Sequence, residues 1–337
     1  MPAHIVDRLR TRYAGIGVCV TGGAGFIGGH LVDALVSLGA RINVIDDLSN
    51  SNTEHLAGLI ELEPERVRFF HGSILDDEAM REATDGVKVV FHLAAVGSVP
   101  LSIEQPQRSW SVNSTGTVRV LEAARAAKAS RVVFSASSSA YGLSEVLPRR
   151  ESEFPTPISP YAASKLAGEG AMMAWAHSYG LSTISLRYFN IFGPRQSADS
   201  AYAAVVSAFA KRLLAGEAPV IHGDGGQSRD FTHVTNAVLA NLLAGSSQRL
   251  LKGEVANIGT GRRISVRELA EAMTRACAGP EPAILQPRFE PARAGDVRDS
   301  QADIARAREL LGYEPVVSFE EGLAETIAWY KESLARA

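Results

Sequence analysis

Short runs of consecutive apolar residues alternate with longer amphipathic segments along the first half of the chain. The apolar runs cover residues 16–21, 41–45, 67–70, 87–93 and 131–135. Strands buried on both faces of a parallel sheet have such continuous runs, whereas strands with one solvated face alternate. Between the runs, apolar residues recur with helical spacing over 26–38 and 108–127, and an acidic helix begins near Asp76. The alternation predicts an α/β fold with a parallel sheet covered by helices on both faces.

The pattern changes after about residue 190. Prolines and glycines interrupt the chain there. Helical segments are predicted over 205–215, 236–244, 266–276 and 318–335, and a proline-rich stretch over 280–291 predicts a loop. We expect residues 1–190 to form the sheet domain and residues 191–337 to form mainly a smaller C-terminal lobe that lies over it.

The composition is that of an ordinary globular protein: 337 residues, 46% hydrophobic and 21% charged, with a formal net charge of -3. This balance argues against attachment to nucleic acid or to a membrane by bulk charge. No apolar run approaches the ~20 residues of a membrane span, and the charged N-terminus lacks a signal-peptide pattern, so we expect a cytoplasmic protein. Cys19 and Cys277 cannot by themselves form a disulfide framework or a zinc site. His30 and His92 lie in no metal-ligand cluster, so we expect structural roles for both and no metal.

A glycine-rich turn, Thr21-Gly-Gly-Ala-Gly-Phe-Ile-Gly28, follows the first predicted strand and opens the first helix. Gly22, Gly25 and Gly28 permit a tight turn, close approach of the backbone to a pyrophosphate, and close helix–strand packing. The helix N-terminus then offers N–H groups and a positive dipole to phosphate. Glycines alone also serve ordinary turns, but the strand before and the helix after them favour a dinucleotide site on a Rossmann-type, doubly wound parallel sheet.

Asp46 ends the second predicted strand, at the distance from the glycine turn that a ribose-binding acid needs. A carboxylate there accepts hydrogen bonds from both ribose hydroxyls and repels a 2′-phosphate, and no arginine follows at once. NAD is therefore favoured over NADP. The alternative is that Asp46 or Asp47 only caps a turn.

Tyr161 and Lys165 stand four residues apart at the start of a predicted helix, so their side chains project from one face. A free tyrosine titrates near ~10, and a base that works near pH 7 needs its pKa lowered by roughly 3 units. The ammonium of Lys165 and a nicotinium ring together favour such a shift. The strand over 131–135 leads into serines placed to hold a substrate hydroxyl beside the phenol. The alternative is an exposed helical pair, against which the order of the three motifs argues.

Together these motifs resemble the extended short-chain dehydrogenase/reductase family, the NAD-dependent epimerases and dehydratases. The resemblance covers about residues 16 to 330 and rests on TGGAGFIG, Asp46, HLAA over 92–95, the serine-ended strand, YxxxK, RYFNIFG over 187–193, SRDF over 228–231 and GDVR over 295–298. It points to the nucleotide-sugar 4-epimerases that act on UDP-glucose and UDP-N-acetylglucosamine. In such enzymes the tyrosine takes the proton of the sugar 4-hydroxyl while C4 gives hydride to tightly held NAD. The 4-keto sugar then turns, and hydride returns to its opposite face.

The resemblance also implies a set of site residues. The implied catalytic residues are Ser137, Ser138, Tyr161 and Lys165. The implied cofactor contacts are Gly22, Gly25, Phe26, Ile27, Gly28, Asp46, Asp47, Asn50, Ser73, Ile74, Leu93, Ala94, Ala95, Tyr161, Lys165 and Tyr188. The implied contacts with a UDP-sugar substrate are Ser98, Ser137, Ser138, Tyr161, Asn190, Gln196, Ala204, Val205, His222, Arg229, Arg263, Arg298 and Ser300.

Within this set the resemblance separates several roles. Asn190 matches a residue that binds the sugar diphosphate, and Ala204, Val205 and His222 match positions around the uridine. Arg229 and Arg298 match a diphosphate clamp, for which two-point guanidinium contacts suit arginine better than lysine. Arg263 is a weaker match, and either it or Arg262 is alternatively a solvated surface charge.

Two serines set this chain apart from neighbouring activities of the family. Sugar 4,6-dehydratases carry Asp-Glu directly after the catalytic serine or threonine, and UDP-glucuronate decarboxylases keep the Glu. Here those positions are Ser138 and Ser139. Since elimination of water needs a carboxylic acid there, a dehydratase is excluded and a decarboxylase is disfavoured.

Ser300 matches a position at which a bulky tyrosine restricts the sugar pocket to unsubstituted hexoses. Replacing a phenol by a hydroxymethyl group leaves room for a 2-acetamido substituent, and pocket shape then sets substrate choice. Gln196 and residues 98–102 are also similar to the acetamido-sugar branch. We therefore expect interconversion of UDP-GlcNAc and UDP-GalNAc, with UDP-Glc and UDP-Gal as further candidates. The alternative is that Ser300 is only a loop hydroxyl.

Three other functions stay open at this stage. One is a UDP-glucuronate 4-epimerase or decarboxylase, and a second is a regulatory protein that binds NAD without turnover, although such proteins typically lose the Tyr or Lys retained here. A third is a steroid-type dehydrogenase, against which the arginines of the diphosphate clamp argue.

Family members also pair as homodimers through two helices, which would be about 108–127 and 161–179. An apolar stripe such as Met172, Met173 and Trp175 alternatively belongs to the core of one chain.

Overall fold

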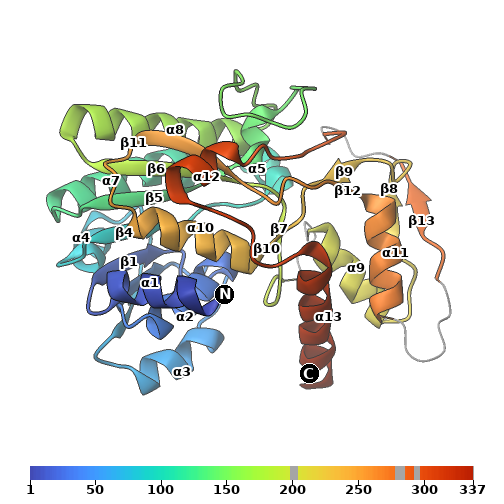
Figure 1. Cartoon of the computed structure of the whole chain (residues 1–337), viewed down its shortest axis with the longest axis horizontal. Helices are drawn as coiled ribbons and strands as arrows, with labels where there is room; N and C mark the ends of the chain where they lie inside the picture. The colour runs from blue at the N-terminus through green and yellow to red at the C-terminus, as the bar shows by residue number, and fades with distance from the viewer. Residues whose placement is uncertain (198–203, 278–284, 292–296, 337) are drawn as a thin grey trace.

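The computed structural model describes residues 1–197, 204–277, 285–291 and 297–336. Its centre is a seven-stranded sheet with the order β11-β6-β5-β4-β1-β2-β3 (Figure 1). The strands are β1 Gly17–Thr21, β2 Arg41–Asp46, β3 Val67–His71, β4 Val89–His92, β5 Arg131–Ser137, β6 Ser182–Tyr188 and β11 Lys252–Ile258. Every neighbouring pair is parallel, which confirms the predicted doubly wound parallel sheet.

Helices cover both faces of the sheet, because successive side chains of each buried strand point to opposite faces. In β1, Val18 and Val20 pack with the helices α1 Ala3–Tyr13, α2 Phe26–Ser37 and α10 Val234–Ser246. Cys19 points the other way, into the layer formed with α4 Asp77–Thr84, α7 Gly116–Ala126 and α8 Pro160–Tyr179. The thiol of Cys19 is fully buried, and burial raises its pKa to about 12.

Local signals fix where the site-bearing helices begin. The carboxylate of Asp76 accepts the N–H groups of Glu78 and Ala79 at the start of α4. Ser159 accepts the N–H of Ala162 at the start of α8, and Pro160 occupies the first helical position. This cap places the YxxxK residues in the first two turns of α8.

The predicted helix over 108–127 is interrupted. It consists of α6 Pro106–Trp110, a π-helical turn over Ser111–Thr115, and α7. The sequence pattern did not reveal this turn, because it shifts the helical phase by only one residue. It also missed α1, α3 Glu54–Leu62, α5 Val99–Glu104, α12 Ala305–Leu311, β6 and β11.

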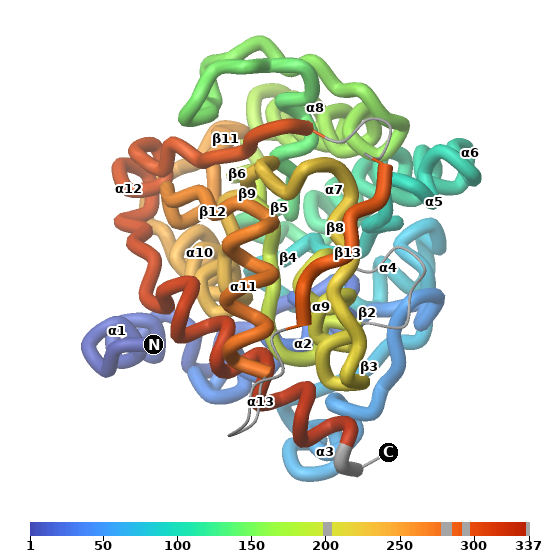
Figure 2. The backbone as a smooth tube through the Cα atoms, turned by 90° about the vertical axis from the view of Figure 1, so that its right-hand side faces the viewer, coloured from blue at the N-terminus to red at the C-terminus, as the bar shows by residue number. Residues whose placement is uncertain are grey.

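A second group of elements packs around its own apolar cluster. It lies to the right of the sheet in Figure 1 and in front of the sheet domain, toward the viewer, in Figure 2. The helices are α9 Val205–Leu214, α11 Val266–Cys277 and α13 Phe319–Arg336. Short strand pairs complete the group: β7 Ile191–Phe192 with β10 Thr232–His233, β9 Ser228–Arg229 with β12 Ile264–Ser265, and β8 Val220–His222 with β13 Arg288–Glu290.

The second half of the chain also contributes to the sheet domain. Between its lobe segments it returns as α10, which packs on the sheet, and as the edge strand β11. The domain boundary at residue 190 therefore stays a prediction: most substrate-binding residues are expected to follow it in the sequence. The predicted loop over 280–291 is wrong at Arg288–Glu290, which pair with β8 because the extended backbone finds an open edge there; its residues 280–284 lie outside the described chain.

None of the described helices combines the length and apolar character that crossing a bilayer requires. Within the same residues, no three His, Cys, Asp or Glu side chains lie close enough together to hold a metal ion.

Candidate active site

The predicted cofactor residues gather at the carboxyl ends of β1, β2 and β4. Gly22 has φ +71°, and a Cβ there would lie 2.6 Å from the N of Ala94. A Cβ on Gly28 would lie 2.1 Å from the O of Gly22. At Gly25, by contrast, a Cβ would meet only that same oxygen within 4 Å, so space lies beside this residue. Since Gly25 caps α2 without a side-chain acceptor, the N-terminus of α2 faces this space as an anion site.

Asp46 is buried at the end of β2 and binds the glycine turn. Its Oδ2 accepts the N–H of Ala24 at 3.0 Å, and its Oδ1 accepts the N–H of Leu48 and the hydroxyl of Ser51, both at 2.9 Å. The bond to Leu48 is the turn-capping contact considered above. The carboxylate therefore caps a turn and also binds the backbone of the glycine-rich turn.

The other predicted cofactor residues surround this edge. Leu93, Ala94 and Ala95 follow β4 and are half-buried, with the N–H of Ala94 donating to Thr21 at 3.2 Å. Phe26 and Ile27 form the half-buried first turn of α2, and Ser73 and Ile74 follow β3. Asp47 and Asn50 are exposed beyond β2.

Tyr188 differs from the other predicted cofactor residues because its phenol points into the core. The phenol is buried and forms hydrogen bonds with Ser135 at 3.0 Å and with Asn241 at 2.6 Å. Burial raises the pKa of this phenol to about 12. Its hydroxyl therefore serves the core.

The predicted catalytic residues come together where β5 ends against the start of α8. Ser137, the last residue of β5, lies close enough to the Tyr161 phenol to affect its pKa. Ser137 also accepts the N–H of Ser139 at 3.2 Å and its hydroxyl at 2.9 Å. Lys165, one turn further along α8, is buried and donates to the carbonyl of Ser135 at 2.8 Å.

Burial controls the charges in this site. It raises the pKa of the Tyr161 phenol, and the neighbouring Ser137 side chain acts in the opposite direction. It also lowers the pKa of Lys165 to about 7, although the carboxylate of Glu169 favours the charged ammonium. The ammonium lies 4.9 Å from the centre of the Phe134 ring, which adds a cation–π contact. Lys165 lies one helical turn from Tyr161 and holds its amine between the Ser135 carbonyl and the Phe134 ring.

Asn113 is a site residue that the sequence analysis missed. It lies in the π-helical turn and is buried. Its amide donates to the carbonyl of Val96 at 3.2 Å and to the hydroxyl of Ser164 at 3.0 Å, and its oxygen accepts the N–H of Val96 at 2.8 Å. It thus ties the segment after β4 to the helix that carries Tyr161. The sequence did hold a signal for this role: an asparagine inside a predicted helix, where its side chain bonds to backbone groups.

The two histidines expected to be structural both hold segments together. His92 is enclosed between the hydroxyls of Thr21 and Thr117, at 2.8 and 2.9 Å, and burial lowers its pKa to about 3, so it is neutral. His30 on α2 bonds to the carbonyl of Pro194 at 2.9 Å.

The predicted clamp residues lie together on neighbouring segments of the lobe. The N–H of Ser300 donates to the carbonyl of Ser228 at 3.0 Å, and Arg229 donates to the carbonyl of Arg298 at 3.2 Å. The guanidinium of Arg298 forms a two-point pair with exposed Asp224, at 2.8 and 3.1 Å. That pair holds the pKa of Asp224 down at about 2.

The remaining predicted substrate residues are distributed around the same side of the lobe. Arg263 lies 3.7 Å from Asp299, and His222 on β8 lies 3.7 Å from Glu290. Ala204 is the exposed residue before α9, and Val205 begins that helix.

Three more of these residues lie on loops at the sheet's edge. Ser98 caps α5 by accepting the N–H of Leu101 at 3.2 Å. Gln196 donates to the carbonyl of Ile191 at 3.0 Å, and Asn190 has φ +36° directly after β6. Neither Asn190 nor Gln196 is fully buried.

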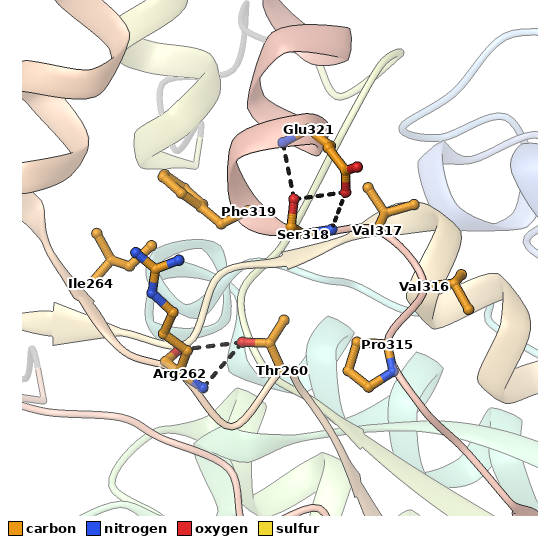
Figure 3. Close-up of a pocket in the computed structure, with 9 residues that line it drawn as sticks. All are labelled: Thr260, Arg262, Ile264, Pro315, Val316, Val317, Ser318, Phe319 and Glu321. Atoms are coloured by element: carbon orange, nitrogen blue, oxygen red, sulfur yellow. Dashed lines mark hydrogen bonds between the residues drawn. The ribbon is translucent and has the colours of Figure 1, made fainter.

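A separate hollow of about 360 Å³ lies where α13 begins (Figure 3). It is lined by Thr260, Arg262, Ile264, Pro315, Val316, Val317, Ser318, Phe319 and Glu321. Ser318 and Glu321 satisfy each other's N–H groups in a capping box. None of the lining residues is among the predicted substrate contacts.

Comparison with known proteins shows the family to which the chain belongs. A sequence model of the NAD dependent epimerase/dehydratase family matches residues 18–259. The UDP-glucose 4-epimerase of Mycolicibacterium smegmatis is 39% identical over 314 residues, 93% of this chain and 97% of that protein. The UDP-N-acetylglucosamine 4-epimerase of Methanobrevibacter ruminantium, solved with UDP-N-acetylmuramic acid, superimposes with a TM-score of 0.88 at 36% identity over 95% of this chain and 99% of that one. The UDP-glucose 4-epimerase of Thermotoga maritima, solved with UDP-glucose, gives 0.87 at 38% identity over 95% and 100%.

Proposed function

This chain belongs to the NAD dependent epimerase/dehydratase family, and on that premise we propose that it is an isomerase that inverts C4 of a UDP-hexose. The observation that carries the proposal is the meeting of Tyr161, Ser137 and Lys165 at the end of β5. The residues after Ser137 are serines, so the site has no acid where a dehydratase needs one. Related 4-epimerases of both UDP-glucose and UDP-N-acetylglucosamine support this reading.

The residues around the glycine turn fit NAD. The turn leaves space beside Gly25 at the N-terminus of α2 for a diphosphate, and Asp46 stands where β2 ends, ready to accept ribose hydroxyls. Bound there, NAD would supply a reversible hydride acceptor for C4 of the sugar, so that the reaction would be redox-neutral overall.

The chain's own residues move the proton. Ser137 holds the sugar 4-hydroxyl against Tyr161, and the phenolate takes its proton. Lys165 stabilises the phenolate because it lies one helical turn from Tyr161. Its ammonium is fixed there by the carbonyl of Ser135. After the 4-keto sugar has turned, Tyr161 returns the proton to the oxygen on C4.

The clamp residues of the lobe hold the UDP moiety. Arg229 and Arg298 lie on adjoining segments, as binding of one diphosphate requires. The side chain of Ser300, on the same segment as Arg298, is small and half-buried. We assign UDP-GlcNAc and UDP-GalNAc as the preferred pair because a 2-acetamido group needs that room.

The function is tested by incubating the purified protein, without added NAD or reductant, with UDP-GlcNAc and separately with UDP-glucose. Anomeric proton NMR then follows the formation of UDP-GalNAc or UDP-galactose. A protein that holds NAD and converts neither sugar would contradict the proposal. UDP-glucuronate is the third substrate in the series, and conversion of it alone would assign the protein to the uronate branch.

The quaternary proposal is a homodimer formed through α7 and α8. Met172 is fully buried within its own subunit and Trp175 is bonded to Glu122, so these two belong to the core of one chain. Val118 on α7 and Met173 on α8 are exposed, and they offer the apolar surface for the partner. Sedimentation equilibrium of the protein and of a Met173→Asp variant tests this.

A further inference from the structure

Asp230 is a fully buried carboxylate that accepts five hydrogen bonds. Its Oδ1 accepts the N–H and hydroxyl of Thr260 at 2.9 and 2.7 Å, and the hydroxyl of Thr232 at 3.4 Å. Its Oδ2 accepts the N–H groups of Gly261 at 2.9 Å and Ala302 at 3.2 Å. All five donors are neutral, and Asp230 forms no salt bridge within the described part of the chain.

These bonds join three segments that are distant in sequence, and each segment carries predicted clamp residues. The first is β9, where Arg229 directly precedes Asp230. The second is the turn at 260–261, which leads to Arg263 two residues later. The third runs through Arg298 and Ser300 to residue 302.

The junction is tightly packed. A Cβ on Gly259 would lie 2.8 Å from the carboxylate of Asp230 and 2.6 Å from the Cβ of Ala302. Burial raises the pKa of this carboxyl, and the hydrogen bonds from Thr260, Ala302 and Gly261 act in the opposite direction. Both oxygens accept donors from the neighbouring segments, so the side chain holds the three segments together at one point.

We propose that Asp230 is the positioning residue of the diphosphate clamp: it fixes Arg229, Arg263 and the 298–300 segment relative to one another. This inference rests on the proposed function, because it assigns those residues to one UDP-sugar. Asp230 touches neither Tyr161 nor the glycine turn in any described contact. Its role is therefore in holding UDP, and the chemistry at C4 and the retention of NAD do not depend on it.

The test is the Asp230→Asn variant of the full chain. An amide nitrogen in place of one oxygen faces N–H donors, so at least one segment is released. We expect UDP affinity by calorimetry to weaken about tenfold or more, and KM for the UDP-sugar to rise in parallel, with kcat within about threefold of wild type. The NAD content after gel filtration is expected to stay unchanged.

The matched control is Ser182→Ala. Ser182 is also a buried oxygen that accepts three hydrogen bonds, from two guanidinium nitrogens of Arg131 and from the N–H of Leu251. It lies at the start of β6, whereas the site lies at the opposite ends of the strands. A general loss of stability lowers the Tm of both variants, but only Asp230→Asn is expected to lose UDP affinity.

If Asp230→Asn does not fold, Thr260→Val removes a single bond to the same carboxylate, and UDP binding about threefold weaker is expected. Unchanged UDP affinity in the folded Asp230 variant, or in Thr260→Val in its place, would overturn the inference, as would an equal loss in Ser182→Ala. Failure of the wild type to invert C4 would instead contradict the proposed function, and the UDP titration would still decide the role of Asp230.

Discussion

Glu169 accepts two hydrogen bonds from the guanidinium of Arg187, at 2.8 and 2.7 Å, one helical turn beyond Lys165. Both side chains of this pair are about 5% exposed. Tyr161, Lys165 and Glu169 follow one another at intervals of four residues along α8, and therefore share a face of the helix. The anion behind Lys165 favours its charged form. The positive charge of Arg187, paired with that anion, acts against it by Coulomb repulsion.

Substituting Glu169 and substituting Arg187 are expected to shift the pH profile of kcat/KM in opposite directions. Glu169→Gln removes the anion and lowers the pKa of Lys165 further below about 7, so fewer molecules carry the ammonium that stabilises the tyrosinate. Because activity needs the ammonium, the descending limb of kcat/KM is expected to move down by about one pH unit. Arg187→Gln leaves Glu169 unpaired, raises the pKa of Lys165, and moves that limb up.

The measurement is kcat/KM between pH 6 and 10 for both variants. The groups around Lys165 include Tyr161, His92, Tyr188 and the Phe134 ring, and His92 stays neutral throughout because its pKa is about 3. A loss of activity with no shift, or shifts in the same direction, would mean that the pair only supports the fold.

Tyr161→Phe removes the proton acceptor while keeping the ring. We expect kcat to fall by about 10²- to 10⁴-fold, the usual contribution of a general base. UDP affinity and NAD content are expected to stay near the wild-type values, because the clamp and the glycine turn are untouched. Single-turnover NMR assays measure the fall in the rate of conversion. A residual kcat above a tenth of the wild-type value would contradict the role of Tyr161 as general base.

Ser300→Tyr places a phenol on the segment beside Arg298. We expect kcat/KM for UDP-GlcNAc to fall about 10- to 100-fold relative to that for UDP-glucose, because the ring takes the room of the acetamido group. Competition between the two sugars in one NMR tube gives this ratio directly. Ser300→Ala serves as the control, and an unchanged ratio in the tyrosine variant would show that another residue sets the preference.

Asp46→Asn removes the charge that faces the ribose. The amide still fills the space between the glycine turn and the loop after β2, but it repels a 2′-phosphate less. The expected result is less NAD retained on gel filtration and an NADP/NAD affinity ratio raised about tenfold. Asp77→Asn, at an exposed surface pair with Arg119, is the charge-matched control. Equal ratios in both variants would contradict the assignment of Asp46.

Arg131→Met is expected to lower stability without altering chemistry. The buried guanidinium donates to Ser182, to Ala244 O at 3.1 Å, and to the carbonyls of Ser247 and Arg249. Orphaned buried acceptors cost about 1–3 kcal/mol each, so we expect a loss of roughly 2–4 kcal/mol in the free energy of unfolding. Urea titration gives this value, and kcat at 25 °C is expected to be within about twofold of wild type.

Features encoded in neighbouring residues could be predicted from the sequence. Continuous apolar runs located β1, β2 and β5, because strands buried on both faces leave no polar alternation. The spacing of Tyr161 and Lys165 placed them on one helical face, and the structure brings them to Ser137. Long-range contacts could not be predicted in this way. The donors of Asp230 come from positions up to 72 residues away, and Glu169 meets Arg187 only because β6 packs against α8.

The edge strand β11 has a consequence during synthesis. Six strands of the sheet are complete once residue 188 has been made, but the outer edge of β6 stays unpaired until residues 252–258 exist. At about 5–20 residues per second, the ribosome needs several seconds to supply them. For that interval the nascent chain presents a row of free backbone donors and acceptors, the kind of edge on which chains aggregate.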